Sequence, residues 1–549
     1  MKTVLSARLS DVIRSARDRY GRTAMRIFIG VPASLLLIVA SAYPVASGLS
    51  NAPRAQAAQA GAAQTAAQVR NWRKVHQQQI MNELVALLAI PNVASDSANI
   101  QRNAEKLTQM LRARGFDTQP LPEPGRGPVI YARLDAPGAK RTVIIYMHYD
   151  GQPVDPAAWH GTKPFEPTLR DARFEDGGKI IPFPTDGRFN DDWRLYARSA
   201  GDDKSPIVAL LAGMDALRAA KIPIRVNLKL ILDSEEEAGS PHLEQTMMTH
   251  RDLLGGDLLI NGDGPVHQSG RMLVVFGNRG VLGVQITVYG PEYPLHSGHY
   301  GNWAPNPAMR LAQLLASMKD DDGRVRIAHF YEGIAPLGPT AQRALEQMPD
   351  NDADLEKALA IQKPDGGGKK LVELLTEPSL NVDGIRSEDV GAQSRNVISD
   401  RAMASLDLRL VKNITPQTQF DRLVAHIRAQ GYYVTAAEPT MEERRTHGKV
   451  ARVMMSEGGY PASMTSMDLP VAKALSDVVD AAAEGGLVRM PILGGSSPMY
   501  IFENLGLPVI TVPICNYDDN QHSSDENLRI GFFWRGIEIY SALLSNLDW

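Results

Sequence analysis

The sequence has very little cysteine and no long run of like charge. Its single cysteine, Cys515, lies in the apolar segment LPVITVPICNY, so an intramolecular disulfide is excluded and a buried strand thiol is expected. The 58 Lys and Arg residues nearly balance the 62 Asp and Glu residues, and neither sign is concentrated along the chain. This pattern argues against a nucleic-acid surface and favours a small-molecule substrate.

The N-terminus combines arginines with an uncharged apolar segment at residues 27–46, and the small residues Ala55-Gln56-Ala57 follow. This order is typical of an export signal, so residues 1–57 are interpreted as a signal peptide and the mature protein is expected to be periplasmic or secreted. The alternative is an uncleaved anchor, which would give the protein its membrane contact. The Ala/Gln-rich residues 58–70 are expected to form a linker.

The remaining chain exceeds the size of one hydrophobic core, which predicts more than one domain. Between residues 71 and 276, nearly all-apolar strands such as TVIIYMHYD alternate with helices, as in an α/β sheet covered on both faces. Residues 277–439 instead show two βαβ-like halves and predict an inserted ferredoxin-like α+β domain. Residues 440–549 are expected to complete the first, α/β domain, whose sheet is mixed.

Chemically distinctive motifs follow several of these strands. In MHYDGQPVD, His148 and Asp150 point to the same side of an extended chain, so Asp150 could support a metal-binding imidazole. In YARSAGDDKSP, Asp202 lies in a small-residue turn that opens a helix, where a carboxylate could bridge two ions or simply cap the helix.

Further carboxylates and a histidine occur at other strand ends. DSEEEAGSP places Glu236 and Glu237 after an apolar strand, where one could bind a metal and the other act as general base; an exposed acidic helix start is the alternative. Asp263 in INGDGP and His522 beyond the last buried strand are ambiguous alone. Together, two imidazoles and three carboxylates suit two divalent ions that share one carboxylate.

The order and spacing of these motifs resemble the dinuclear zinc exopeptidase family of carnosine-type dipeptidases, aminoacylases, succinyl-diaminopimelate desuccinylase and carboxypeptidase G, closest to its dipeptidase branch. The resemblance extends from Asn71 to the C-terminus and includes WHGTKPFEP and HSGHYG. It implies two divalent ions per subunit, with zinc as the preferred metal and cobalt or manganese as alternatives. It also implies a cis peptide bond after the bridging aspartate. The implied ligands are His148 and Asp263 for one ion, Glu237 and His522 for the other and Asp202 as bridge, with Asp150 and Glu236 as catalytic residues.

The resemblance also assigns the inserted domain as a lid through which a homodimer forms. It implies that His296 of HSG reaches the active site of the partner subunit and that Arg409 binds the terminal carboxylate of the substrate, although a salt-bridged surface arginine is the alternative for Arg409. Asn396 would lie nearby, and Gly495 and Ser496 of LGGSSP would contact the substrate backbone.

The resulting hypothesis is an exported, homodimeric, metal-dependent peptidase that releases the C-terminal residue of dipeptides or short peptides, using water activated by two metals and a Glu general base. Hydrolysis of N-acyl amino acids, by a deacylase or desuccinylase, is the first alternative. A non-catalytic receptor or scaffold on the same fold is the second. The family's GRGxxDxKG reads ARSAGDDKS here, and this departure leaves the substrate specificity open.

Overall fold

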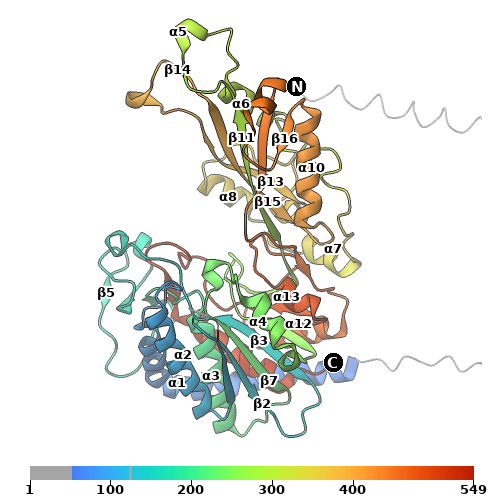
Figure 1. Cartoon of the computed structure of the whole chain (residues 1–549). Coiled ribbons are helices and arrows are strands. Elements are labelled where there is room, and N and C mark those ends of the chain that lie inside the picture. The colour runs from blue at the N-terminus through green and yellow to red at the C-terminus, as the bar shows by residue number, and fades with distance from the viewer. Residues whose placement is uncertain (1–51, 123–126) are drawn as a thin grey trace, which may run out of the picture. The chain divides into compact units, whose positions relative to one another are not determined.

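A computed structural model describes residues 52–122 and 127–549, which belong to one compact unit (Figure 1). Most of the predicted export signal lies outside the described residues. Among the helices that the structure describes, none is long and apolar enough to cross a membrane.

The α/β domain that is expected to be catalytic is built on an eight-stranded mixed sheet with the order β1-β2-β7-β3-β8-β20-β9-β19. Its centre consists of β7 (Asn227–Asp233), β3 (Thr142–His148), β8 (Leu258–Asn261) and β20 (Val509–Thr511), which are parallel to their neighbours in this group. The four carboxyl ends therefore meet at one edge. The outer strands are β1 (Asp117–Leu121), β2 (Val129–Leu134), β9 (Met272–Val275) and β19 (Leu487–Met490).

Helices bury both faces of this sheet, as its nearly all-apolar strands predict. Val143, Ile145 and Met147 of β3 belong to the core under helices α1, α3, α12 and α14, whereas Ile144 and Tyr146 belong to the core on the other face, with α4 and α13. These helices span α1 (Ala52–Leu88), α3 (Lys204–Ala220), α4 (Leu243–Thr249), α12 (Pro470–Ala482), α13 (Tyr500–Asn504) and α14 (Ile530–Asn546); α2 (Ser97–Ala113) also packs against the first core.

The expected linker at residues 58–70 is wrong, because this segment is part of the continuous helix α1. Ala62, Ala66 and Val69 are buried in the main core, and Thr65 Oγ accepts a hydrogen bond from Asn546 Nδ2 at 3.1 Å. Alanine is the best helix former, and its small side chain lets α1 approach α14 closely. The Ala/Gln-rich segment therefore packs against α14 as part of the folded domain.

The inserted domain is a five-stranded sheet with the order β13-β15-β11-β17-β16. Leu282, Val284 and Ile286 of β11 (Gly280–Tyr289) point to a core shared with α6 (Pro307–Ala316) and α10 (Pro416–Ala429). The other strands are β13 (Ser379–Arg386), β15 (Arg401–Leu410), β16 (Tyr433–Thr435) and β17 (Val450–Met455).

The predicted end of the inserted domain at residue 439 is too early. Strand β17 pairs with β11 and β16, so the domain extends at least to Met455. The excursion between Gly323 and Lys370 is also less irregular than expected, since it contains α7 (Pro339–Glu346) and α8 (Asp352–Ala358).

Short elements complete the chain. A four-stranded sheet, β21-β6-β4-β5, carries the insertion that follows Trp159. The short elements are β4 (Thr168–Arg170), β5 (Ile180–Ile181), β6 (Arg194–Tyr196), β10 (Gly277–Asn278), β12 (Leu295–His296), β14 (Val397–Ile398), β18 (Ser463–Met464), β21 (Asn527–Arg529), α5 (Ser297–Tyr300), α9 (Leu371–Leu374) and α11 (Met441–Thr446).

Candidate metal centre

The expected ligands converge at the carboxyl edge of the four central parallel strands. His148 is the last residue of β3, Glu237 follows β7 and Asp263 follows β8. His522 lies in the loop beyond β20, and Asp202 lies in the turn that precedes α3. Ligand sites form at such edges in α/β sheets because loops from several strands meet there.

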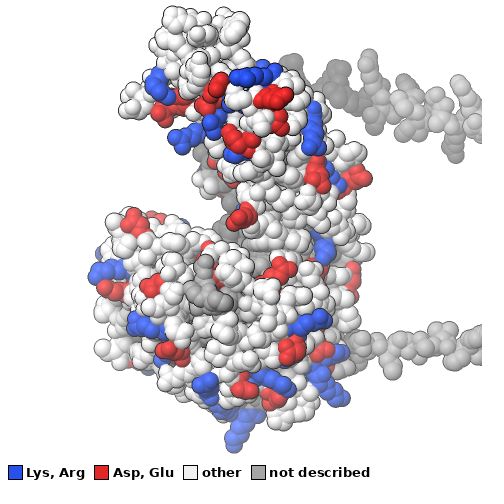
Figure 2. Space-filling view, viewed as in Figure 1, with Lys and Arg blue, Asp and Glu red and all other residues white. Residues whose placement is uncertain are grey.

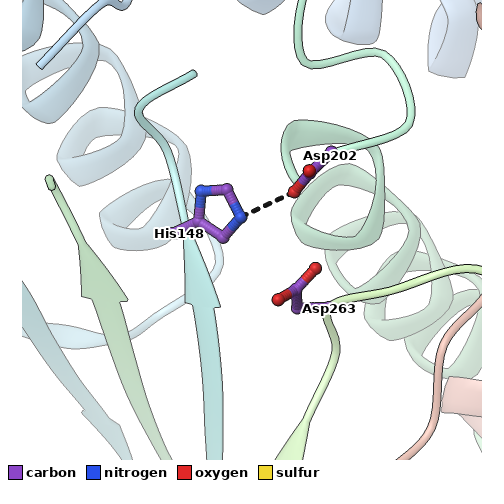
Figure 3. A group of neighbouring side chains, drawn as sticks. All are labelled: His148, Asp202 and Asp263. Atoms are coloured by element: carbon purple, nitrogen blue, oxygen red, sulfur yellow. Dashed lines mark hydrogen bonds and ion pairs between the residues drawn. The ribbon is translucent and has the colours of Figure 1, made fainter. Parts of the chain in front are cut away.

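One group of possible ligands consists of His148, Asp202 and Asp263, which point toward one another in Figure 3. One ligand atom of each residue lies within 4.8 Å of the others, and His148 Nε2 is 2.8 Å from Asp202 Oδ1. The buried Asp263 Oδ1 has no hydrogen-bond partner among the described residues. Because an unpaired buried carboxylate oxygen is costly, this donor set fits a cation.

A second group consists of Asp202, Glu237 and His522, so Asp202 belongs to both groups. His522 Nε2 lies 3.1 Å from Asp202 Oδ2 and 3.0 Å from Glu237 Oε2. Gln521 and Gln152 donate hydrogen bonds to the same two carboxylate oxygens. Two oxygens of one carboxylate directed at two different groups suit a bridging ligand. The Asp202–Asp203 peptide bond is cis, as the resemblance implies.

Asp150 and Glu236 lie beside these groups. The buried Asp150 has Oδ1 at 3.3 Å from His148 Nδ1, and its two oxygens accept hydrogen bonds from the backbone N–H groups of Glu236 and Glu237, each at 3.1 Å. One carboxylate therefore orients the imidazole and fixes the turn that carries both glutamates.

The pKa shifts show an excess of negative charge in the metal-free site. Burial raises the pKa of Glu236 well above its usual value; His148 opposes this shift, and the carboxylates of Asp263 and Asp202 reinforce it. Burial and the charge of Asp202 raise the pKa of Asp263 to about 7. For Asp202 burial acts in the same direction, but hydrogen bonds from His148 and His522 hold its pKa well below the ordinary value. Divalent cations would relieve this repulsion.

The sequence analysis missed the carboxylate that shapes the Asp202 turn. Glu526, fully buried, accepts hydrogen bonds from the backbone N–H groups of Gly201 and Asp202 on Oε1, and from Ser199 N and Arg198 Nη1 on Oε2. Cys515 is a buried free thiol, as predicted, and its Sγ lies 2.6 Å from the Gly201 carbonyl oxygen. The position of Glu526 four residues after His522 could have marked it as a residue near the site. Its role, however, depends on contacts with residues more than 300 positions earlier in the chain.

The expected substrate residues divide between two places. Arg409 Nη1 donates to Ser496 Oγ at 2.8 Å and its Nε to Asp407 at 2.9 Å, while the Gly495 carbonyl accepts from Arg279 N. Arg409, Gly495 and Ser496 are therefore brought together. Burial and the charge of Arg409 lower the pKa of Arg279 to about 10, with the charge of Asp407 opposing the shift.

His296 and Asn396 lie elsewhere on the inserted domain. His296 is exposed and pairs with Val397 across β12 and β14, and Ser297 N donates to the Asn396 carbonyl. Strand β14 comes just before Arg401, the first residue of β15, whereas Arg409 lies near the other end of β15. The eight residues from Arg401 to Arg409 span about 27 Å of strand. The expectation that Asn396 lies near Arg409 is therefore wrong within one chain.

Comparison with known proteins identifies the family. The model of peptidase family M20/M25/M40 matches residues 144–546. The chain belongs to this family. It is 26% identical to the Cys-Gly metallodipeptidase DUG1 of Candida albicans over 84% of this chain and 93% of that protein, and 25% identical to the Beta-Ala-His dipeptidase of Mus musculus over 79% and 82%. Among solved structures, it resembles the M20 family metallo-carboxypeptidase Sso-CP2 of Sulfolobus solfataricus, with 27% identity, a TM-score of 0.68 and coverage of 85% of this chain and 98% of that one.

Membership of the M20/M25/M40 peptidases establishes the class of activity: the protein is a metal-dependent peptidase. The two groups that share Asp202 are where its own residues could hold divalent ions. On the face seen in Figure 2, positive and negative side chains are interspersed and neither forms a continuous area.

Proposed function

We propose that this M20 peptidase hydrolyses the peptide bond of dipeptides or short peptides and releases the C-terminal residue. The observation that supports this most directly is the pair of ligand groups joined by Asp202, with Glu236 beside them. Two bound divalent ions, zinc in the first place, would polarise the scissile carbonyl and lower the pKa of a water molecule.

Glu236 acts as the general base in this proposal. It takes a proton from the attacking water and passes it to the leaving amine; its carboxylate lies beside the two groups and belongs to neither, whereas both oxygens of Asp150 already accept backbone hydrogen bonds. Asp150 positions Glu236 through the hydrogen bond to its backbone N–H and also contacts the His148 imidazole.

Arg409 is proposed to bind the terminal carboxylate of the substrate. Its Nη2 has no partner among the described residues, and the adjacent Arg279 adds a second positive charge. Gly495 and Ser496 are close enough to this position to contact the substrate backbone. A carboxylate is the natural ligand for such a site, because a guanidinium group can donate two parallel hydrogen bonds to it.

His296 and Asn396 are proposed to act in a second copy of the chain. Within one chain they lie about 27 Å along the sheet from Arg409, too far to share a dipeptide with it. If both sets contact one substrate, the inserted domain of a partner subunit must supply His296 and Asn396. A homodimer formed through this domain satisfies that requirement.

We propose dipeptides rather than N-acyl amino acids as the substrates because the relatives named above include dipeptidases that act on Cys-Gly and β-Ala-His. The complete set of five ligands argues against a non-catalytic receptor or scaffold. Hydrolysis of a panel of dipeptides, N-acetyl amino acids and N-succinyl amino acids by the zinc-loaded protein tests this proposal. Faster cleavage of the N-acyl compounds would replace it with the deacylase function.

Replacing the general base tests the mechanism. Glu236→Gln should retain both metals but lower kcat by at least about 100-fold, because general base catalysis typically contributes 10²–10⁴-fold. Metal content is measured on the same preparation as turnover. A fully metallated Glu236→Gln protein with undiminished turnover would exclude Glu236 from this role.

The protein is further proposed to act outside the cytoplasm, on the evidence of the N-terminal sequence alone. Fractionation of cells that express the full chain, with N-terminal sequencing of the product, distinguishes a cleaved signal from a membrane anchor. Recovery of uncleaved protein in the cytoplasmic fraction would reject both.

A further inference from the structure

Tyr460 occupies a position beside the proposed substrate site that no role above explains. It lies after β17, in the segment that returns to the catalytic domain, and forms an antiparallel bridge with Val281. Both backbone hydrogen bonds of the bridge, Val281 N to Tyr460 O and Tyr460 N to Val281 O, measure 3.0 Å. The backbone position of Tyr460 is therefore fixed.

The sheet register places Tyr460 on the same face as Arg409. Val281 pairs with Arg409 on its other side, and residues directly opposite each other in an antiparallel pair project to the same face. This face lies opposite the core of the inserted domain, because the buried core residue Leu282 alternates with the half-buried Val281. Arg409, Val281 and Tyr460 thus form one row, about 10 Å from end to end.

The Tyr460 ring stacks on a second tyrosine. Its centroid lies 5.6 Å from that of Tyr500, with the rings 16° from parallel, and Tyr500 Oη donates to Glu244 at 2.8 Å. Tyr500 begins α13, just after the loop of Gly495 and Ser496. The stack therefore joins the segment leaving the inserted domain to the substrate loop.

The Tyr460 hydroxyl has no hydrogen-bond partner among the described residues, although the side chain is half-buried. Burial raises the pKa of this phenol, with the charge of Glu236 adding to the increase and that of Arg409 opposing it. The phenol therefore lies within electrostatic reach of both the proposed general base and the proposed carboxylate ligand. It keeps its proton at physiological pH and remains a hydrogen-bond donor.

We infer that Tyr460 is a substrate-binding residue whose hydroxyl donates a hydrogen bond to the terminal carboxylate of the substrate, alongside the guanidinium group of Arg409. This inference rests on the proposed peptidase site. A carboxylate can accept several hydrogen bonds, and Arg409 already uses Nε and Nη1 on Asp407 and Ser496. A neutral donor on the same row supplies a further bond without adding charge.

The test combines a change in the protein with a change in the ligand. Zinc-loaded wild type and Tyr460→Phe are titrated by calorimetry with a phosphinic pseudodipeptide acid and with its C-terminal amide. Tyr460→Phe should weaken binding of the acid about tenfold and leave binding of the amide within about twofold, because one hydrogen bond to a charged group is lost only with the acid. With a dipeptide substrate, KM should rise and kcat should stay within about twofold.

Tyr433→Phe is the matched control, since Tyr433 is also half-buried and loses only a hydroxyl that donates to Glu443. It should change neither titration. Equal weakening of acid and amide by Tyr460→Phe, or no weakening of either, would overturn the inference; thermal midpoint and zinc content identify a folding defect. Failure of the proposed function looks different: the wild type itself would cleave no dipeptide, or would bind acid and amide equally.

Discussion

Replacing Glu526 with glutamine should destabilise the protein although it changes no expected ligand. Each Glu526 oxygen accepts two hydrogen bonds: Oε1 from Gly201 N and Asp202 N at 3.0 Å, and Oε2 from Ser199 N at 3.0 Å and Arg198 Nη1 at 2.7 Å. The amide of glutamine can accept on one side only, so its NH₂ group would face two donors. Arg198, 2% exposed, would lose its paired carboxylate.

The expected loss in unfolding free energy is about 3–5 kcal/mol, the range for breaking a buried ion pair from one side. The Asp202 turn would also lose its support, so zinc affinity should fall by about 10- to 100-fold, as for other groups that orient metal ligands. Urea denaturation of the metal-free protein measures the first effect, and competition with a chromogenic chelator measures the second.

The pH of this experiment matters. Burial raises the pKa of Glu526 to about 7, and Arg198 opposes the shift, so the carboxylate is ionised at pH 8. Glu166→Gln is the control, because Glu166 is 67% exposed and its pair with Lys163 contributes less than about 1 kcal/mol. A loss at pH 8 no larger than that of Glu166→Gln would refute the reasoning, since it would mean that Glu526 carries no charge that Arg198 needs.

Two further predictions concern the metals and helix α1. Hydrogen bonds to Asp202 and Glu237 raise the pKa of His522 to about 11 in the metal-free protein, so this contribution to stability is complete below about pH 6.5 and is lost as the pH rises through about 11. Zinc binding at pH 8 should therefore release at least one proton, seen by calorimetry in buffers of different ionisation enthalpy; a buffer-independent heat would contradict this. Separately, a chain beginning at residue 71 should be less stable in urea than one beginning at residue 58 by about 3 kcal/mol, because it loses the buried Ala62, Ala66 and Val69; equal stability would show that this part of α1 contributes nothing.

The sequence predicted the catalytic sheet well because its strands are coded locally. The apolar run before His148 predicts a strand that is buried on both faces, and β3 indeed faces a different core on each side. The histidine and carboxylate residues at the strand ends predicted the metal ligands, and the parallel pairing of the strands brings those ends together. The family comparisons agree with the resemblance that those motifs showed.

The failures have a common cause, which is that tertiary contacts determine the outcome. The Ala/Gln composition of residues 58–70 predicts a linker, yet helix propensity and contacts with α14 make this segment a packed helix. Strand β17 pairs with β11, the central strand of its sheet, which lies more than 150 residues earlier in the chain. A local sequence pattern does not indicate such a long-range pairing. The distance between Asn396 and Arg409 likewise follows from strand length and direction rather than from either motif.

The charge distribution around the site explains why these residues must act together with cations. Asp150, Asp203 and Asp263 are buried or nearly so, and the pKa of each is raised by burial as the first cause. Lys204 is fully buried, and its Nζ donates to the carbonyl oxygens of Leu87 and Ile90 rather than to a carboxylate. Burial lowers the pKa of Lys204 as well, so the positive charges beside the carboxylates are those of His148, His522 and Arg198, and the pKa of Asp263 is raised to about 7 despite them. Because an isolated buried carboxylate is strongly unfavourable, the site is best balanced when divalent ions occupy it, and its stability should then depend on metal concentration.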